Sequence, residues 1–237
     1  MWFYWQYYAM GIILIPGIIL AIIAQSKISS AYKTFSQVMS KKGLTGAQVA
    51  QIILDGANIT TAKIQAIPGK LTDNYNPKTD VVSLSKGVHD STSIAAIGIA
   101  AHEVGHTIQH HTNYMPVQIR NVLIPVSNVM SKLLWPLLII GIILNFTTLL
   151  GTAVMWTAIG IFGLSVLIQL VTLPVEKNAS RRALKILESS DILNEEELRG
   201  AKKVLNAAAL TYVAALLVSV LSFMRFFLAV AGNRNKK

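Results

Sequence analysis

Long runs without charge are the feature that most constrains the fold of this chain. No Asp, Glu, Lys or Arg occurs between residues 133 and 175, and residues 1–24 are also uncharged. About 20 consecutive apolar residues are enough for a helix to cross the hydrocarbon core of a bilayer. The run at 133–175 can cross twice, so it predicts a helical hairpin with Gly151 between the two spans.

Composition and charge support a membrane protein. The chain is 53% hydrophobic and only 14% charged, whereas soluble domains carry about 25% charged residues. The net charge is +10, but the basic residues lie beside apolar runs and no nucleic-acid-binding motif accompanies them, so we expect no nucleic-acid partner. The absence of cysteine excludes disulfides and thiolate metal ligands, so any zinc site must use His, Asp or Glu.

These patterns predict an α-helical membrane protein with about four transmembrane helices and a small aqueous α+β domain. The aromatic residues near the start of the first span are typical of a membrane interface, and a cleaved signal peptide is disfavoured because no positive charge precedes the apolar run. The expected order is a transmembrane helix at 1–24, an aqueous domain at 25–132, transmembrane helices at 133–150 and 152–173, an aqueous segment at 174–206, a transmembrane helix at 207–231 and a basic tail at 232–237.

The distribution of Lys and Arg predicts the orientation. Ten of these residues fall in 25–132 and seven in 174–206, and the membrane hairpin returns both segments to one side. Short loops rich in Lys and Arg stay on the cytoplasmic side. We therefore expect a multi-pass protein of the cell membrane, with both aqueous segments in the cytoplasm and both termini outside.

Within the aqueous domain, three stretches predict regular structure before the histidine-rich region. Residues 44–54 predict a helix in which Thr45 is the N-cap and Gln48 completes a capping box. Residues 62–67 and 80–85 predict strands, separated by a turn-rich stretch.

The stretch at 99–111, "IAAHEVGHTIQHH", carries the chemistry. It predicts a helix that begins after an N-cap at Asp90 or Ser91 and ends near His111, followed by another helix from about Val117. His102 and His106 are four residues apart and lie on one helix face. With Glu103 they form His-Glu-x-x-His, the spacing of zinc metalloproteases. The alternative is an ordinary helix with a polar stripe.

A catalytic zinc usually has three protein ligands, and His110 cannot be the third. It lies eight residues after His102, or about 12 Å along the helix axis, whereas a Zn–N bond is about 2 Å long. The metzincin pattern is also absent, because Gln109 and Thr112 occupy the positions where it has Gly and His. We expect His110 and His111 to be exposed or to support the metal ligands without binding the metal themselves.

Glu176 is the better candidate for the third ligand. Pro174 suits the first turn of a helix, on which Glu176 shares a face with Ser180, and the membrane hairpin returns this segment to the side of His102. Small residues that allow the two helices to approach closely are Ala100, Ala101, Gly105, Ala179 and Ala183. The alternative is a surface carboxylate paired with Arg181 or Arg182.

Three blocks in order, "GLTGAQVAQIIL", "SIAAIGIAAHEVGHTIQ" and "LPVEKNASRRALKIL", make the chain resemble the YugP-like family of bacterial membrane neutral zinc metallopeptidases. A more distant similarity is to HtpX-type and CAAX-processing membrane proteases. The resemblance implies a zincin-like domain of the gluzincin type and one Zn²⁺ per chain. It also implies that His102, His106 and Glu176 are the metal ligands and that Glu103 is the general base.

The chain departs from these families at four positions. Asn74, Asn76 and Asn178 stand where His, Asp and an acidic residue are more common in the YugP-like family, and Ser180 stands where the HtpX-type helix has Asp. Histidines that bind a metal usually donate their other N–H to an acceptor. We expect Ser180 or Asn178 to serve as that acceptor.

The substrate contacts remain open at this stage. A peptide that pairs with a sheet edge would use the strand at 80–85, although a plain core strand is an equal alternative. Tyr75, His89, Tyr114 and Arg181 are available to stabilise negative charge on the substrate.

Together the patterns predict a membrane-embedded zinc metalloendopeptidase that hydrolyses peptide bonds of peptides or membrane proteins through a zinc-activated water, with the lipid bilayer as its other partner. The alternative is a catalytically silent zinc-binding membrane scaffold. A transporter is disfavoured because the spans contain almost no ionisable residues.

Overall fold

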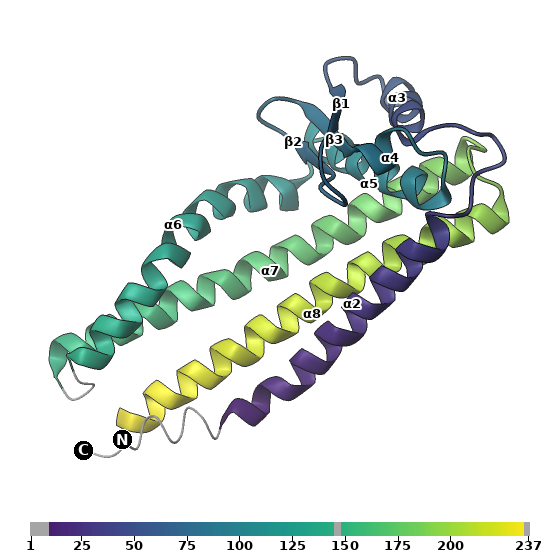
Figure 1. The fold of residues 1–237 in the computed structure, drawn as a ribbon. Helices are drawn as coiled ribbons and strands as arrows, with labels where there is room; N and C mark the ends of the chain where they lie inside the picture. Colours follow the sequence, from purple (N-terminus) through teal and green to yellow (C-terminus); the bar gives the residue numbers. More distant parts are fainter. Residues whose placement is uncertain (1–9, 145–147, 235–237) are drawn as a thin grey trace. The chain divides into compact units, whose positions relative to one another are not determined.

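The computed structural model describes residues 10–144 and 148–234 (Figure 1). It confirms the expected fold class, since it has four long apolar helices and a small mixed sheet. The elements are η1 (Met10–Leu14), α2 (Ile15–Phe35), α3 (Gly46–Gly56), β1 (Lys63–Ile67), β2 (Asn74–Asn76), β3 (Val81–Ser85), α4 (Lys86–His89), α5 (Ile94–His111), α6 (Met115–Ile143), α7 (Leu149–Ser189) and α8 (Glu195–Arg234).

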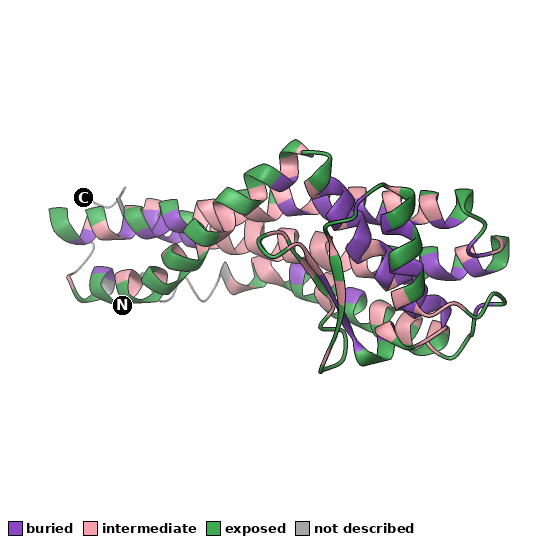
Figure 2. Cartoon of the chain, turned by 90° about the horizontal axis from the view of Figure 1, so that it is seen from above, coloured by how far each residue is buried: buried purple, intermediate pink, exposed green. Residues whose placement is uncertain are grey.

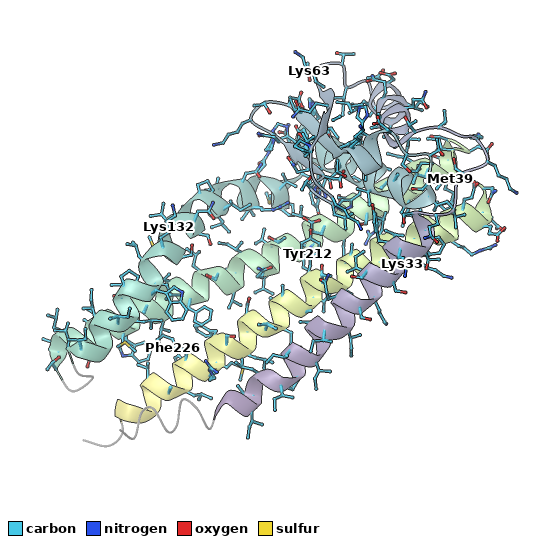
Figure 3. The ribbon with its side chains drawn as sticks, viewed as in Figure 1. Lys33, Met39, Lys63, Lys132, Tyr212 and Phe226 are labelled. Carbon is cyan, nitrogen blue, oxygen red and sulfur yellow. The ribbon has the colours of Figure 1, made fainter. Side chains whose placement is uncertain are left out.

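The chain divides into two compact units. Unit 1 comprises Met1–Ile23, Ile119–Leu173 and Tyr212–Lys237, and unit 2 comprises Ala24–Gln118 and Pro174–Thr211. The helices α2, α6, α7 and α8 pass from one unit into the other, and the sheet with α3, α4 and α5 lies within unit 2. Figure 3 shows nitrogen and oxygen atoms concentrated on unit 2, as expected for an aqueous domain.

Unit 1 contains most of the apolar surface. Four helices are long and apolar enough to cross a membrane by length and composition: Gly11–Phe35, Met115–Gly141, Leu149–Ser189 and Glu195–Ala231. Large side chains such as Val129, Ile139 and Leu167 are exposed on these helices, which suits contact with lipid chains. Inside the unit, Met155 of α7 and Phe226 of α8 belong to one buried apolar cluster, and Phe226 is labelled in Figure 3.

The turn between α6 and α7 comes earlier than the sequence predicted. α6 ends at Ile143 and α7 begins at Leu149, so Gly151 lies in the first turn of α7. The physical reason is a helix cap: the Thr148 hydroxyl oxygen accepts a hydrogen bond from the backbone N–H of Gly151 at 3.0 Å. A hydroxyl at this position satisfies a free N–H of the first turn, so the helix begins there.

The sheet of unit 2 has the order β1-β3-β2. β1 pairs with β3 in parallel, with Lys63 opposite Val81, and β2 pairs with β3 antiparallel, with Asn74 opposite Ser83. β3 is therefore the central strand of the sheet. The prediction that residues 80–85 form a plain core strand is confirmed, and the prediction that they form a sheet edge for a peptide is wrong. The sequence pattern did not predict β2, because two of its three residues are Asn, which is depleted in strands.

The helix starts of unit 2 test the capping predictions. α3 has the expected Thr45 N-cap and a complete capping box with Gln48. The predicted N-cap of α5 at Asp90 or Ser91 is wrong, because Ser93 is the N-cap and its hydroxyl accepts from the Ala96 N–H at 3.2 Å. Asp90 is instead the C-cap of the short helix α4. The sequence pattern did not predict α4 as a helix separate from α5.

α5 lies in the hydrophobic core of unit 2. Ala100, Ala101 and Val104 of this helix are fully buried and belong to one cluster with residues of α3, β3, α7 and α8. Figure 2 shows such buried residues in purple on these helices. α5 also carries His102 and His106. Packing of this helix in the core therefore fixes the positions of the two imidazoles.

Candidate metal centre

His102 and His106 of α5 face Glu176 of α7. The Nε2 atoms of the two histidines lie 3.3 Å and 3.4 Å from Oε2 of Glu176, and their ring centroids are 4.7 Å apart. One donor atom from each of the three residues lies within 4.8 Å of the others, which makes them a group that could hold a metal ion. All three residues belong to unit 2, so the cluster lies within one compact unit.

Small residues allow this convergence. A Cβ atom added to Gly105 would come within 2.7 Å of the carbonyl oxygen of Ala179, so α5 and α7 are almost in backbone contact there. On α7, Glu176 exposes only 2% of its surface and Ser180 9%, and both lie on the buried face with Ala183. The alternative of a surface carboxylate does not fit, because Glu176 is buried. Arg182 is engaged elsewhere, since its Nε donates to Asn178 at 2.8 Å.

The second nitrogen of each histidine has a protein partner. Nδ1 of His102 lies 3.0 Å from the Ser180 hydroxyl, the kind of contact expected of Ser180. Nδ1 of His106 lies 3.0 Å from Oε1 of Gln109. Asn178 accepts a hydrogen bond from Gln109 Nε2 at 3.0 Å and so supports His106 through Gln109.

Gln109 determines the tautomer of His106. The Gln109 amide nitrogen donates to the backbone carbonyl of Val175 at 2.8 Å. Because a carbonyl can only accept, this contact defines which end of the amide is Oε1, and Oε1 can only accept from His106. Nδ1 of His106 therefore carries a proton, so in the neutral imidazole, the form that binds a metal, Nε2 has the free lone pair, and this atom faces Glu176.

This donor set fits a zinc ion. A histidine lone pair and a carboxylate oxygen are both acceptors, so their close approach is favourable when a cation lies between them. Two imidazoles and one carboxylate are also the protein ligands found at several catalytic zinc sites. The support of each histidine by a hydroxyl or an amide is the arrangement that orients metal ligands in proteins.

The sequence pattern did not indicate that Gln109 is part of the site. Position 109 stood out only because it lacks the glycine of the metzincin pattern. A local signal existed, because Gln109 lies one turn after His106 on the same helix. Its contacts with Val175 and Asn178, however, join positions 66 and 69 residues away, and no local pattern predicts them.

Glu103 lies beside the cluster on α5 and exposes 8% of its surface. Burial, which disfavours a charged carboxylate, raises the pKa of Glu103 above its ordinary value, even though the nearby His102 and His106 act in the opposite direction. A carboxyl with a raised pKa takes and returns a proton more readily near neutral pH.

The remaining candidate residues make other contacts. The Tyr75 hydroxyl donates to Asp80 at 2.9 Å and lies 3.1 Å from Nδ1 of His110. Nε2 of His111 lies 3.1 Å from the same aspartate. His110 and His111 therefore join α5 to the sheet and lie outside the metal-ligand group.

Two further candidates for charge stabilisation are also engaged. Nδ1 of His89 lies 2.6 Å from a carboxylate oxygen of Asp90. The Arg182 guanidinium lies 5.9 Å from the ring of Tyr114. Arg181 instead lines a groove between α7 and α8, together with Ser180.

A partly buried His-His-Glu cluster, with its glutamate on a helix long and apolar enough to cross a membrane, is typical of a membrane protein with a candidate metal site. The chain belongs to the family described as "Putative neutral zinc metallopeptidase", whose sequence model matches residues 10–231. It is 39% identical over 213 residues to the "Putative membrane protease YugP" of Bacillus subtilis (strain 168), which covers 90% of this chain and 92% of that protein. No solved structure matches the chain.

Proposed function

We propose that this chain is a zinc metalloendopeptidase of the gluzincin type, which holds one Zn²⁺ per chain through His102, His106 and Glu176. The observation that carries this proposal is the close approach of the three donor atoms, all within 4.8 Å of one another. The contact of His106 Nδ1 with Gln109 adds support, because it leaves Nε2 as the atom of a neutral imidazole that can bind a metal.

The chain's own residues have distinct roles in this proposal. When bound, zinc makes water more acidic and polarises the scissile carbonyl. Glu103 takes the proton of the attacking water and passes it to the amide nitrogen that leaves. The raised pKa of Glu103 suits both steps, since the same group first accepts and then donates a proton. Ser180 and Gln109 hold the imidazoles of His102 and His106 in position.

We place the substrate along β2. The strand order makes β2 an edge strand, and among the residues that the structure describes no strand pairs with its outer side. β2 also contacts α5, the helix that carries Glu103. An extended peptide can add to such an edge through main-chain hydrogen bonds, which suits cleavage of unfolded or flexible segments of peptides and membrane proteins.

The orientation in the membrane is part of the proposal. The excess of Lys and Arg in 25–132 and 174–206 supports a cytoplasmic position for unit 2. In this arrangement the proposed catalytic group works at the cytoplasmic surface of the cell membrane.

Zinc analysis tests the ligand set. We expect one zinc per chain in the full-length protein purified in detergent, the same content in Glu103→Gln, and a sharp loss in Glu176→Ala. Glu188→Ala is a matched control, since this exposed glutamate lies on the same helix. A folded wild-type protein that neither contains zinc nor takes it up would overturn the proposal, and equal zinc in Glu176→Ala would show that Glu176 is not a ligand.

Cleavage of an unfolded protein such as casein tests the chemistry. The wild type and Glu188→Ala should cleave it, whereas Glu103→Gln should bind zinc and lose cleavage by at least 100-fold, because a positioned base contributes about 10²–10⁴-fold. Full activity in Glu103→Gln would contradict the role of this residue. A zinc-loaded wild type that cleaves nothing, in detergent or in liposomes, would favour the scaffold alternative.

A further inference from the structure

A basic groove lies between α7 and α8 within unit 2. Its volume is about 540 Å³. The polar and apolar residues that line it are Lys177, Ser180, Arg181, Leu184, Lys185, Glu188, Leu198, Lys202, Asn206 and Ala209. Four of these side chains are cationic and one is acidic, so the groove attracts an anion.

The cations of this groove have no partner among the described residues. Neither an ion pair nor a hydrogen bond joins the side chains of Lys177, Arg181, Lys185 or Lys202 to the part of the chain that the structure describes, although all four are exposed. Some other basic residues of unit 2 are paired, as in the contact of Lys42 with Asp191 at 3.1 Å. Four like charges that share one groove repel each other, and a bound anion relieves this repulsion.

The groove begins close to the apolar parts of both helices. Along α7, unit 2 resumes at Pro174, and Lys177 follows about 5 Å further on. Along α8, Asn206 directly precedes the uncharged run that starts at residue 207. The polar headgroup layer of a bilayer is about 5–7 Å thick on each side, so a bilayer core that ends where the charged residues begin would bring the near end of the groove to headgroup level.

The groove also has an apolar wall. Leu184, Leu198 and Ala209 line it beside the cations. A mixed lining of this kind suits an amphiphile better than an acidic peptide, which presents carboxylates on a polar backbone. Lysine ammonium groups bind phosphate as point charges, and basic pockets between membrane helices bind lipid headgroups.

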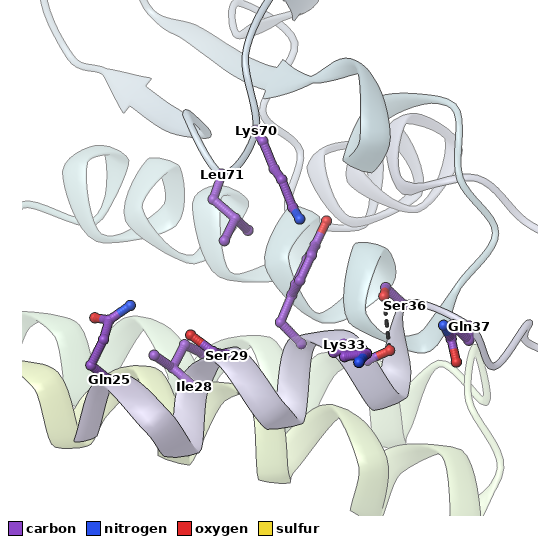
Figure 4. A pocket seen from close by; sticks show the side chains of 9 residues that line it. Gln25, Ile28, Ser29, Lys33, Ser36, Gln37, Lys70 and Leu71 are labelled. Atoms are coloured by element: carbon purple, nitrogen blue, oxygen red, sulfur yellow. Dashed lines mark hydrogen bonds between the residues drawn. The ribbon is translucent and has the colours of Figure 1, made fainter. Parts of the chain in front are cut away.

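A second groove of unit 2 provides a comparison. It holds about 450 Å³ and contains two lysines, Lys33 and Lys70. Figure 4 shows Lys70 extending toward this groove from the loop that precedes β2. Its ammonium lies 5.4 Å from the centre of the Tyr32 ring, so this cation is already engaged. The groove between α7 and α8 is the more cationic of the two.

We propose that the groove between α7 and α8 binds the phosphate headgroup of an anionic phospholipid. Lys177, Arg181 and Lys202 contact the phosphate in this arrangement, and Leu184, Leu198 and Ala209 contact the glycerol and the first acyl carbons. The proposed lipid site involves no zinc and no step of peptide hydrolysis, although Ser180 lines the groove and also contacts His102.

Native mass spectrometry of the full-length protein in detergent tests this site. The protein is titrated with phosphatidylglycerol or with phosphatidylcholine, and bound lipids are counted. We expect the wild type to retain phosphatidylglycerol selectively. The Lys177→Gln/Lys202→Gln variant should bind it roughly 30-fold more weakly, since each lysine near an anionic lipid contributes about fivefold. Lys177→Arg/Lys202→Arg should bind as the wild type does.

The matched control is Lys63→Gln/Lys78→Gln, which removes the same charge from exposed lysines outside both grooves. It should bind phosphatidylglycerol as the wild type does. Equal weakening in this control would overturn the proposal, because the effect would then follow from net charge alone. Selective binding of inorganic phosphate or of an acidic peptide without phosphatidylglycerol would also overturn it.

Discussion

Gly105 of α5 and Ala179 of α7 lie so close that a Cβ atom on residue 105 would come within 2.7 Å of the Ala179 carbonyl oxygen. The neighbouring atoms are backbone, so they cannot move aside as a flexible side chain would. Because His106 and Ser180 follow these two residues, the approach of the helices and the geometry of the histidine cluster depend on the same contact.

The first prediction concerns this contact. Gly105→Ala should destabilise the protein by about 1–3 kcal/mol, the usual cost of overpacking, and should weaken zinc binding because α5 and α7 move apart. Gly98→Ala is the matched control, since its Cβ would come no closer than 3.4 Å to any atom outside its own helix, the nearest being the Ala201 Cβ. That substitution should be neutral or stabilising by up to ~1 kcal/mol, because Ala favours a helix over Gly. Thermal unfolding in detergent measures both, and equal stability of the two variants would contradict the close packing.

The second prediction concerns the amide that orients His106. Gln109→Leu removes the acceptor of His106 and leaves the buried Val175 carbonyl without its side-chain donor. Zinc affinity should fall about 10–100-fold, as is typical when the partner of a metal-bound histidine is removed. Competition with a chromophoric chelator measures the change. Gln118→Leu, which removes only an exposed bond to Asn113, should leave the affinity unchanged.

The third prediction concerns the hydroxyl that contacts His102. Ser180→Ala should weaken zinc binding about 10-fold or more, whereas Ser180→Asp should bind zinc at least as tightly as the wild type, because a carboxylate makes a stronger, charge-assisted hydrogen bond. The same chelator competition separates the two variants. If Ser180→Ala and the wild type bind zinc equally, the contact at 3.0 Å does not orient His102.

The fourth prediction concerns stability in acid. Burial alone would raise the pKa of Asp80, but the hydrogen bonds from Thr61, His111 and Tyr75 outweigh it and hold the pKa below its ordinary value. A carboxyl with a lowered folded-state pKa stabilises the protein above the unfolded-state pKa, about 3.9, and this contribution is lost as the pH falls through the folded-state value. Asp80→Asn should therefore melt below the wild type at pH 7, and the difference should shrink below about pH 4.

Asp191→Asn is the control for Asp80→Asn. Both aspartates have a positive φ, 54° at Asp80 and 52° at Asp191, which asparagine also adopts. The ion pair of Asp191 with Lys42 is exposed, so its loss should change stability little. A pH-independent difference between Asp80→Asn and the wild type would show that the charge of Asp80 is not what stabilises the fold.

The sequence predicted most of what depends on local pattern. Apolar runs of about 20 residues predict membrane-crossing helices regardless of how they pack, and the capping box of Thr45 and Gln48 lies within four residues. The spacing of His102 and His106 places both on one face of a helix. Glu176 followed from chain topology, because a membrane hairpin returns the second segment to the same side.

The missed features depend on contacts between distant segments. β2 forms because Tyr75 pairs opposite Val82 of β3, although its own residues favour turns. α5 begins after its N-cap Ser93. A bridge between Ser93 and Met39 holds the preceding residues out of the helix. Gln109 supports His106 only because the Val175 carbonyl defines the orientation of its amide.

The separation of the cluster along the chain has a consequence for protein synthesis. His102 and its partner Ser180 are 78 residues apart, and α6 and the first part of α7 are translated between them. A ribosome that has reached the end of α6 has already made α5 but has yet to make Glu176. The metal-binding group is therefore complete only after the hairpin has been made, so a nascent or truncated chain that ends within the hairpin has no complete ligand set with which to act on its neighbours.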